Sequence, residues 1–235
     1  MAADRGPKHP DALDWTRIDA ELDEYGVART GPLLDAKTCR EISALYETDA
    51  FRSRVVMARH GFGSGEYQYF ANPLPAPVAA LREAIYPHAA RTANRWAERL
   101  GMPAYPARLV DMLARCHEAG QQKPTPLLLK YAAGDYNCLH QDLYGAVAFP
   151  LQLVVLLSDP AGFEGGELVL TEQRPRMQSR VEVVPLGLGE GALFATSERP
   201  RRGSKGDYRV KLRHGVSRLR SGSRMTLGVI FHDAA

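Results

Sequence analysis

The chain has 235 residues, of which 45% are hydrophobic and 24% are charged, and its net charge at pH 7 is +3. These values are ordinary for a soluble globular protein. No apolar run approaches the ~20 residues that a membrane-spanning helix needs, and the N-terminus lacks the apolar core of a secretory signal. We therefore expect a cytoplasmic protein without a membrane partner, whose polar residues 1–10 are disordered at their start.

The chain contains three cysteines, Cys39, Cys116 and Cys138, an odd number without C-x-x-C spacing. This pattern argues against both a disulfide framework and a structural zinc site. Cys138 lies two residues before His140 and can share a strand face with it, but the simpler interpretation is a small buried thiol.

The first third of the chain combines helices with short strands. Apolar residues at steps of three and four predict amphipathic helices over 14–25 and after the potential cap Asp35. A short strand is expected between them, over 27–34. The same spacing predicts a long helix over 77–100, which Pro87 is expected to kink or divide.

A hairpin is predicted between the second and the long helix. Residues 51–60 form one strand, the glycine-rich residues 61–65 form the connection, and the extended pattern resumes over 66–70. Tyr67 and Tyr69 then lie on one side of the second strand. Such a hairpin is either a lid over a substrate or a plain structural hairpin.

After Pro126 the pattern changes to short strands separated by turn signals. We expect eight of them, at 127–132, 137–142, 149–158, 166–170, 180–185, 191–196, 208–216 and 223–232. Eight short strands preceded by helices predict a mainly β fold with helical support, namely a double-stranded β-helix or jelly roll. Residues 1–125 would form the support region and residues 126–235 the β-helix core, within one integrated domain.

Two metal-capable side chains stand two residues apart in His140-Gln141-Asp142. On a strand, residues i and i+2 project from one face, so His140 and Asp142 can converge on one ion while Gln141 points away. A lone His-X-Asp also occurs by chance or serves only structure. His214, on a later strand, would complete the two histidines and one carboxylate of non-haem iron oxygenases, whereas zinc hydrolases more often use three histidines or two plus a glutamate.

The last predicted strand has one polar face. Alternation places Arg224, Thr226 and Gly228 together, and this combination suits a ligand cavity. Arg224 can grip a small carboxylate bidentately while Thr226 donates a further hydrogen bond, although an ordinary surface arginine is the alternative. Along an extended strand His232 would lie roughly 25 Å from Arg224. If Arg224 is near the metal, His232 is therefore a poorer third ligand than His214.

These residues resemble the Fe(II)/2-oxoglutarate-dependent dioxygenases, which carry His-X-Asp, a later histidine and an arginine. The leader Lys130-Tyr131-Ala132-Ala133-Gly134 resembles the Tyr-Ala-Pro-Gly leader of AlkB-type nucleic-acid demethylases, and the run 165–168, Gly-Gly-Glu-Leu, recurs in prolyl-hydroxylase-like members. More closely, residues 131–233 are similar to a bacterial AlkB-like family presumed to demethylate damaged DNA. Leu129 departs from the AlkB-type pattern, which has an asparagine at that place.

The resemblance implies a distorted double-stranded β-helix with a complete oxygenase site. The catalytic and metal residues are His140, Asp142 and His214, which hold Fe(II). Arg224 and Tyr131 hold 2-oxoglutarate, with Thr226 beside them, and O2 is the cosubstrate. The implied reaction is oxidative demethylation of a partner nucleic acid, alkylated DNA or RNA.

Residues 199–224 carry ten Lys or Arg and one Asp, a net charge of +9, which leaves −6 for the rest of the chain. This basic window is either a footprint for a polyanion or a solvated loop and strand edge. In the nucleic-acid interpretation, Phe62, Tyr67 and Tyr69 stack an exposed base.

Two other functions stay open. A hydroxylase of a protein side chain or small metabolite is one, in which Arg174, Arg176 and Arg180 beside Met177 line a pocket for an acidic substrate or form a solvated loop. A jelly-roll binding module without turnover is the other, and the complete set of four site residues argues against it.

Overall fold

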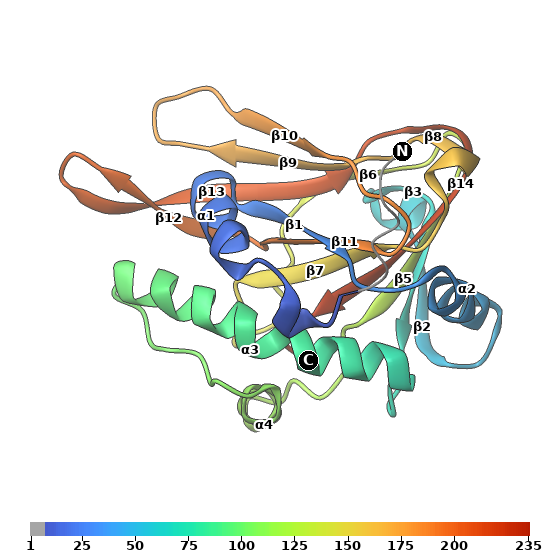
Figure 1. The fold of residues 1–235 in the computed structure, drawn as a ribbon, viewed down its shortest axis with the longest axis horizontal. Coiled ribbons are helices and arrows are strands. Elements are labelled where there is room, and N and C mark those ends of the chain that lie inside the picture. Colours follow the sequence, from blue (N-terminus) through green and yellow to red (C-terminus); the bar gives the residue numbers. More distant parts are fainter. Residues whose placement is uncertain (1–7) are drawn as a thin grey trace.

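The computed structural model describes residues 8–235. The expected disorder at the start of the chain falls on residues 1–7, which lie outside the described residues. Two antiparallel sheets, one of eight strands and one of six, pack against each other, and helices lie along the larger sheet (Figure 1). The predicted fold, a double-stranded β-helix with helical support, is confirmed. None of the helices in residues 8–235 is long and apolar enough to cross a lipid bilayer.

The larger sheet contains the most deeply buried strand of the protein. Its order is β1 (Val27–Pro32), β11 (Glu190–Ala195), β7 (Leu151–Leu156), β14 (Leu219–Ile230), β5 (Leu127–Ala132), β4 (Glu66–Phe70) and β2 (Phe51–Val56), with β8 (Phe163–Gly165) paired to β14. All six residues of β7 are buried, as expected for a strand that is covered on both faces. Strands from both halves of the chain share this sheet, and the division near residue 125 stays a prediction.

The smaller sheet carries two long hairpins that extend beyond the body of the molecule (Figure 1). Its order is β10 (Arg180–Val184), β9 (Leu168–Gln173), β13 (Gly206–Val216), β6 (Tyr136–His140) and β3 (Gly63–Ser64), with β12 (Glu198–Gly203) paired to β13. The sequence did not predict β8 or β12. The first has three residues, and the second contains three arginines and a proline, so that only pairing with β13 makes it a strand.

Capping residues mark the starts of the first two of the four α-helices in residues 8–235. The helices are α1 (Trp15–Tyr25), α2 (Ala36–Ala44), α3 (Ala76–Arg99) and α4 (Leu109–Glu118), with 3-10 turns at Pro10–Ala12, Leu45–Glu47, Met57–His60 and Pro160–Gly162. Asp14 caps α1 and Asp35 caps α2, each by accepting a backbone N–H with its carboxylate. Gly26 ends α1 in the left-handed conformation, at φ 77°. Pro87 lies inside α3 without dividing it, and α4 was not predicted.

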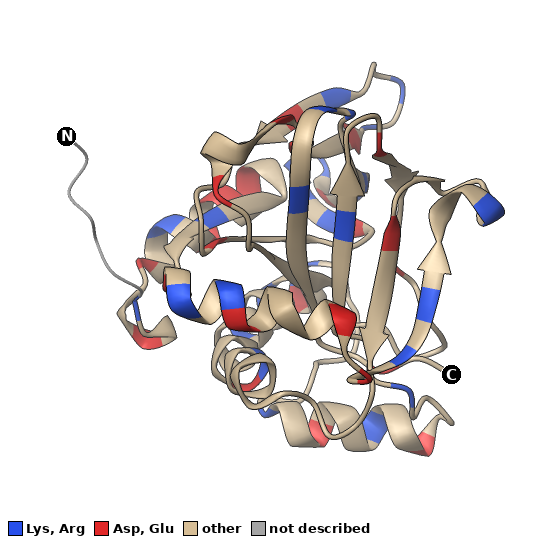
Figure 2. Ribbon diagram, turned by 90° about the vertical axis from the view of Figure 1, so that its right-hand side faces the viewer, with Lys and Arg blue, Asp and Glu red and all other residues tan. Residues whose placement is uncertain are grey.

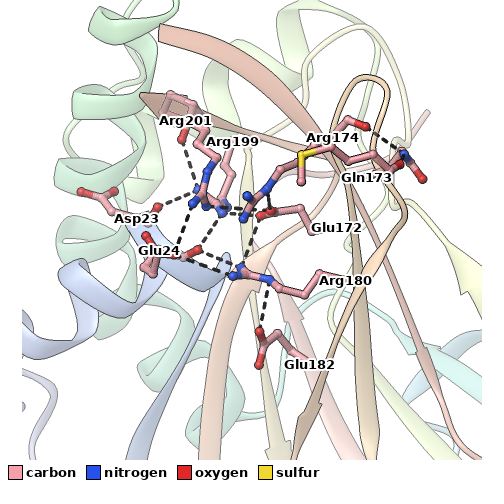
Figure 3. A network of polar contacts seen from close by, with 11 residues as sticks. Asp23, Glu24, Glu172, Gln173, Arg174, Arg180, Glu182, Arg199 and Arg201 are labelled. Atoms are coloured by element: carbon pink, nitrogen blue, oxygen red, sulfur yellow. Dashed lines mark hydrogen bonds and ion pairs between the residues drawn. The ribbon is translucent and has the colours of Figure 1, made fainter. Parts of the chain in front are cut away.

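A buried ion network joins the two long hairpins to the end of α1 (Figure 3). Glu172 on β9 is only 2% exposed, and it accepts hydrogen bonds from the fully buried Arg199 and from Arg174. Arg199 also donates to the backbone carbonyl of Glu24 at 2.7 Å. Burial alone would raise the pKa of Glu172, but the hydrogen bond from Arg174 and the charges of Arg199 and Arg180 hold it below its usual value.

We expect Glu172→Gln to destabilise the fold by about 3 kcal/mol at pH 7, because it leaves Arg199 buried without its counter-charge. A carboxylate whose pKa is lowered in the folded state stabilises the protein above its unfolded pKa of about 4.3, and the contribution is lost as pH falls through the folded pKa. The difference between wild type and variant should therefore shrink on acidification below about pH 4. Urea unfolding at several pH values measures both effects.

Glu182→Gln is the matched control, because its carboxylate is part-exposed and pairs with Arg180 at 3.4 Å on the same hairpin. A partly exposed pair of this kind is worth less than about 1 kcal/mol. Equal losses of stability in the two variants would contradict the role given to Glu172.

Candidate active site

Two side chains from the smaller sheet and one from the loop that follows β6 place their donor atoms together. His140 Nε2 lies 3.4 Å from Asp142 Oδ1, and His214 Nε2 lies 3.2 Å from Asp142 Oδ2. One ligand atom from each residue lies within 4.8 Å of the others, a separation that suits a single metal ion. The structure thus brings together the three residues that the sequence proposed as metal ligands.

Strand pairing explains why the two histidines meet. His140 on β6 is the direct cross-strand partner of His214 on β13, and their ring centroids are 4.2 Å apart. The predicted strand over 137–142 was too long, because β6 ends at His140. Beyond that point the Leu212 carbonyl accepts the Gln141 side-chain amide at 2.8 Å, so the ladder stops. Asp142 therefore approaches the histidines from the following loop, while Gln141 points away as predicted.

Hydrogen bonds and burial influence the protonation of the three donors. His140 Nδ1 lies 2.8 Å from the Cys138 carbonyl, which only accepts, so Nδ1 carries a proton and Nε2 faces the other donors. Burial alone would lower the pKa of His140, but the hydrogen bond to Asp142 and the charge of that carboxylate raise it. Burial lowers the pKa of His214, which keeps this imidazole neutral. Burial alone would raise the pKa of Asp142, but the two imidazoles beside it hold that pKa well below its usual value.

Cys138 contributes to the site through its backbone. The expectation that the Cys138 thiol is buried is wrong, because Cys138 is exposed, whereas Cys39 and Cys116 are buried. Alternation places Cys138 on the same strand face as His140, and its exposed side chain is among the residues that line the cavity beside the donors. The carbonyl of Cys138, not its thiol, orients His140.

A cavity of about 350 Å³ lies between the two sheets and contains the three donors. The face of β14 that was predicted to line a cavity does so, through Arg224, Thr226, Gly228 and Ile230. His232 does not reach it, because its ring is buried and accepts the Phe149 N–H at 3.1 Å. Arg224 is only 4% exposed, and its Nη1 has no hydrogen-bond partner among residues 8–235. A buried, incompletely paired guanidinium in a cavity fits a bound carboxylate.

Arg224 is held by a specific environment. It lies opposite Tyr131 in the β14–β5 pairing, with its guanidinium 5.8 Å from the tyrosine ring centroid. Tyr131 is fully buried behind Arg224, its hydroxyl has no partner within the described chain, and burial raises its pKa to about 12. Gly166 has φ +67°, and a Cβ there would lie 2.9 Å from Arg224 Cδ. The Gly165-Gly166 turn therefore leaves the space that Arg224 occupies.

The hairpin of β2 and β4 forms a wall of the cavity. Tyr67 and Tyr69 face inward from β4, and Phe62 lies at the rim with 47% of its surface exposed. The Phe62 carbonyl accepts the Cys138 N–H at 2.8 Å, and Gly63 pairs with Asn137 on β6. Backbone hydrogen bonds thus tie the hairpin to the strand that carries His140.

Sequence reasoning missed two polar residues that touch the donors. Tyr144 donates a hydrogen bond to Asp142 Oδ1 at 2.5 Å, and the Gln152 amide lies 3.0 Å from His214 Nε2. Gln152 did leave a signal, because it is the one polar residue in the buried apolar strand β7. Tyr144 left none, since it lies in a loop without periodicity.

About half of the cations in the basic window are paired or buried within the protein. Arg199 and Arg201 pair with Glu172 or Glu24, Arg202 with Asp207, and Arg209 with Glu198, while Arg224 lies in the cavity. The cations of the window without an ion pair in the described part of the chain are Lys205, Lys211, Arg213, Arg218 and Arg220. Figure 2 shows positive and negative positions interspersed along the ribbon on the side that it presents. The polyanion footprint is therefore smaller than the net charge of the window indicated.

Arg174 and Arg180 are also committed to internal partners. Both lie against Glu172, and Arg180 also pairs with Glu182 and Glu24 (Figure 3). They neutralise buried and part-buried carboxylates of the protein. This arrangement leaves them unsuited to the acidic-substrate pocket that the sequence allowed.

A family model matches residues 65–234, and its description is "Oxygenase, catalysing oxidative methylation of damaged DNA". Two uncharacterized proteins from two strains of Mycobacterium tuberculosis are 49% identical over 168 residues, which is 71% of this chain and 72% of theirs.

Solved structures share the fold. An oxidoreductase of the 2OG-Fe(II) oxygenase family from Burkholderia pseudomallei is 16% identical with a TM-score of 0.53, covering 94% of this chain and 92% of its own. A prolyl-4-hydroxylase from Pseudomonas putida is 15% identical with a TM-score of 0.51, covering 91% and 96%. The epimerase SnoN from nogalamycin biosynthesis is 16% identical with a TM-score of 0.56, covering 91% and 80%.

We expect His140→Ala and Asp142→Ala each to weaken Co(II) binding by more than about 100-fold, since changes behind a ligand alone cost about 10–100-fold. Isothermal titration of the purified protein with Co(II) measures this loss. His60→Ala, which removes an exposed imidazole stacked on Phe62, is the control and should bind Co(II) like wild type. Unchanged affinity in both donor variants would show that the metal lies elsewhere.

Proposed function

This chain belongs to the oxygenase family whose model spans residues 65–234, and from that membership we propose that it is an Fe(II)/2-oxoglutarate-dependent dioxygenase that oxidatively demethylates alkylated nucleic acid. The observation that carries the proposal is a single cavity that contains both the three-donor group and the incompletely paired Arg224. A metal site and a carboxylate site in one cavity are what a 2-oxoglutarate oxygenase requires.

In this proposal His140, Asp142 and His214 would hold the iron. Two imidazoles and one carboxylate are the donor set of non-haem iron oxygenases, and such a set would let the ion take further ligands. When bound, Fe(II), 2-oxoglutarate and O2 supply the oxidation that hydroxylates a substrate C–H bond, with 2-oxoglutarate converted to succinate and CO2.

The protein's own contribution is to bind and orient the 2-oxoglutarate. Arg224 would pair with its distal carboxylate through the guanidinium edge that lacks a partner among residues 8–235. The buried Tyr131 hydroxyl and the Thr226 side chain supply further hydrogen-bond donors beside Arg224. The buried Val154 and Leu168 line the same cavity and exclude water from it.

Two observations support a nucleic-acid substrate. The family description refers to damaged DNA, and the cavity has an aromatic wall of Phe62, Tyr67 and Tyr69 on which a planar base can stack. A base in a duplex would first have to leave the stack. Hydroxylation of an N-methyl group gives a hydroxymethyl product that breaks down to formaldehyde and the repaired base.

The second candidate is a hydroxylase of a protein side chain or a small metabolite. The observation in its favour is the internal pairing of the basic window, since half of its ten cations are buried or paired with carboxylates, which leaves fewer of them for phosphates. Leu129, in place of the asparagine of AlkB-type enzymes, also favours this second candidate. The oxygenase chemistry and its site residues are the same in both candidates.

We expect Arg224→Ala to raise the KM for 2-oxoglutarate by about 10- to 100-fold, because a charge-assisted hydrogen bond contributes about 1.5–3 kcal/mol. Steady-state succinate formation over a range of 2-oxoglutarate concentrations measures the change. Arg40→Ala, an exposed arginine on α2, is the control. An Arg224→Ala enzyme with the wild-type KM would contradict the carboxylate role.

We expect the purified protein, with Fe(II) and 2-oxoglutarate, to release formaldehyde from N-methylated oligonucleotides and to bind them less tightly at higher salt. Formaldehyde detection and binding at two salt concentrations test the two parts, with Asp142→Ala as the inactive control. Absence of both effects would remove the nucleic-acid proposal. Succinate formation on a peptide or metabolite would then favour the second candidate.

A further inference from the structure

Asp142 differs from the two histidines in how it is supported. His140 and His214 are fixed by the hydrogen-bonded ladder of β6 and β13. Asp142 lies two residues beyond the end of β6, in the loop that leads to β7. No strand pairing fixes it within the described chain, so its orientation has to come from side-chain contacts.

The backbone on one side of Asp142 is anchored by its neighbour. The Gln141 amide donates to the carbonyls of Ser197 and Leu212, at 3.0 and 2.8 Å. These two bonds attach the start of the loop to β13 and to the segment before β12. They place the Cα of Asp142, but they leave the rotation of its carboxylate free.

The carboxylate itself is held by Tyr144. The Tyr144 hydroxyl donates to Asp142 Oδ1 at 2.5 Å, and the Tyr69 hydroxyl lies 3.4 Å from the Tyr144 hydroxyl. The Arg52 guanidinium stacks 4.6 Å from the centroid of the Tyr69 ring. Tyr144 is therefore part of a chain of contacts that reaches the wall of the cavity.

We propose that Tyr144 is a positioning residue that keeps the Asp142 carboxylate turned toward the histidine Nε2 atoms and so strengthens divalent-metal binding. This inference rests on the proposed metal role of the three donors. A hydrogen bond from the phenol to one carboxylate oxygen limits the rotations that Asp142 can adopt. Partners of metal ligands at this distance are worth about 10- to 100-fold in metal affinity.

The cavity offers a matched control for the hydroxyl. Tyr67 lines the same cavity from the same wall as Tyr69, and its ring is 5.4 Å from that of Tyr69. Its hydroxyl makes no hydrogen bond to a metal donor in residues 8–235. Tyr67→Phe therefore removes the same chemical group from the same cavity without touching Asp142.

The test is a titration of the metal-free protein with Co(II). Calorimetry measures the affinity, and the visible ligand-field spectrum reports the surroundings of the bound ion. We expect Tyr144→Phe to lose about 10- to 100-fold in affinity and to shift the spectrum, and Tyr67→Phe to stay within about twofold of wild type. Tyr144→Leu, which also removes the ring, should lose a similar affinity to Tyr144→Phe while losing more thermal stability.

Several results would overturn the inference. Wild-type affinity and spectrum in Tyr144→Phe would show that the hydroxyl does not position Asp142, and loss in Tyr144→Leu alone would assign the effect to packing. In both cases the proposed function would still hold, because the wild-type protein would still bind Co(II). Failure of the wild-type protein itself to bind Co(II) would overturn the proposed function together with this inference.

Discussion

The pairing of His140 with His214 across β6 and β13 is the contact on which the rest of the site depends. Side chains alternate between the two faces of a strand, so a slip of one residue in this register would turn one imidazole out of the cavity. The Cys138 carbonyl then fixes the ring of His140, and Asp142 reaches both Nε2 atoms from the adjacent loop. The register of β6 against β13 thus brings the three metal-capable side chains together.

The larger sheet supplies the other end of the cavity. β14 alternates between a face packed in the core and a face that lines the cavity, and Arg224 is the first cavity residue of the second face. Its burial is possible because Gly166 leaves space against its side chain. Burying an incompletely paired guanidinium costs free energy, and a carboxylate bound in the cavity would offset that cost.

Much of this site could be predicted from the sequence because its signals are local. Two-residue periodicity placed Arg224 and Thr226 on one face and directed His140 inward. Apolar spacing indicated α1, and the capping residue Asp35 gave the start of α2. The predictions that failed concern features that depend on residues far away in the sequence. The end of β6 is set by the Gln141 contact with Leu212, and β12 exists through its pairing with β13. Carboxylates outside the basic window pair with some of its arginines, such as Glu172 with Arg199. Tyr144 and Gln152 have meaning only once the donors are assembled.

The central claim is that one cavity holds a metal at His140, Asp142 and His214 together with 2-oxoglutarate at Arg224. The most direct measurement is a crystal structure of the protein prepared without oxygen in the presence of Fe(II) and 2-oxoglutarate, with anomalous data at the iron edge. We predict one anomalous peak within bonding distance of the three donors and the distal carboxylate of 2-oxoglutarate against the Arg224 guanidinium. An iron peak away from these donors, or 2-oxoglutarate bound without contact to Arg224, would contradict the account.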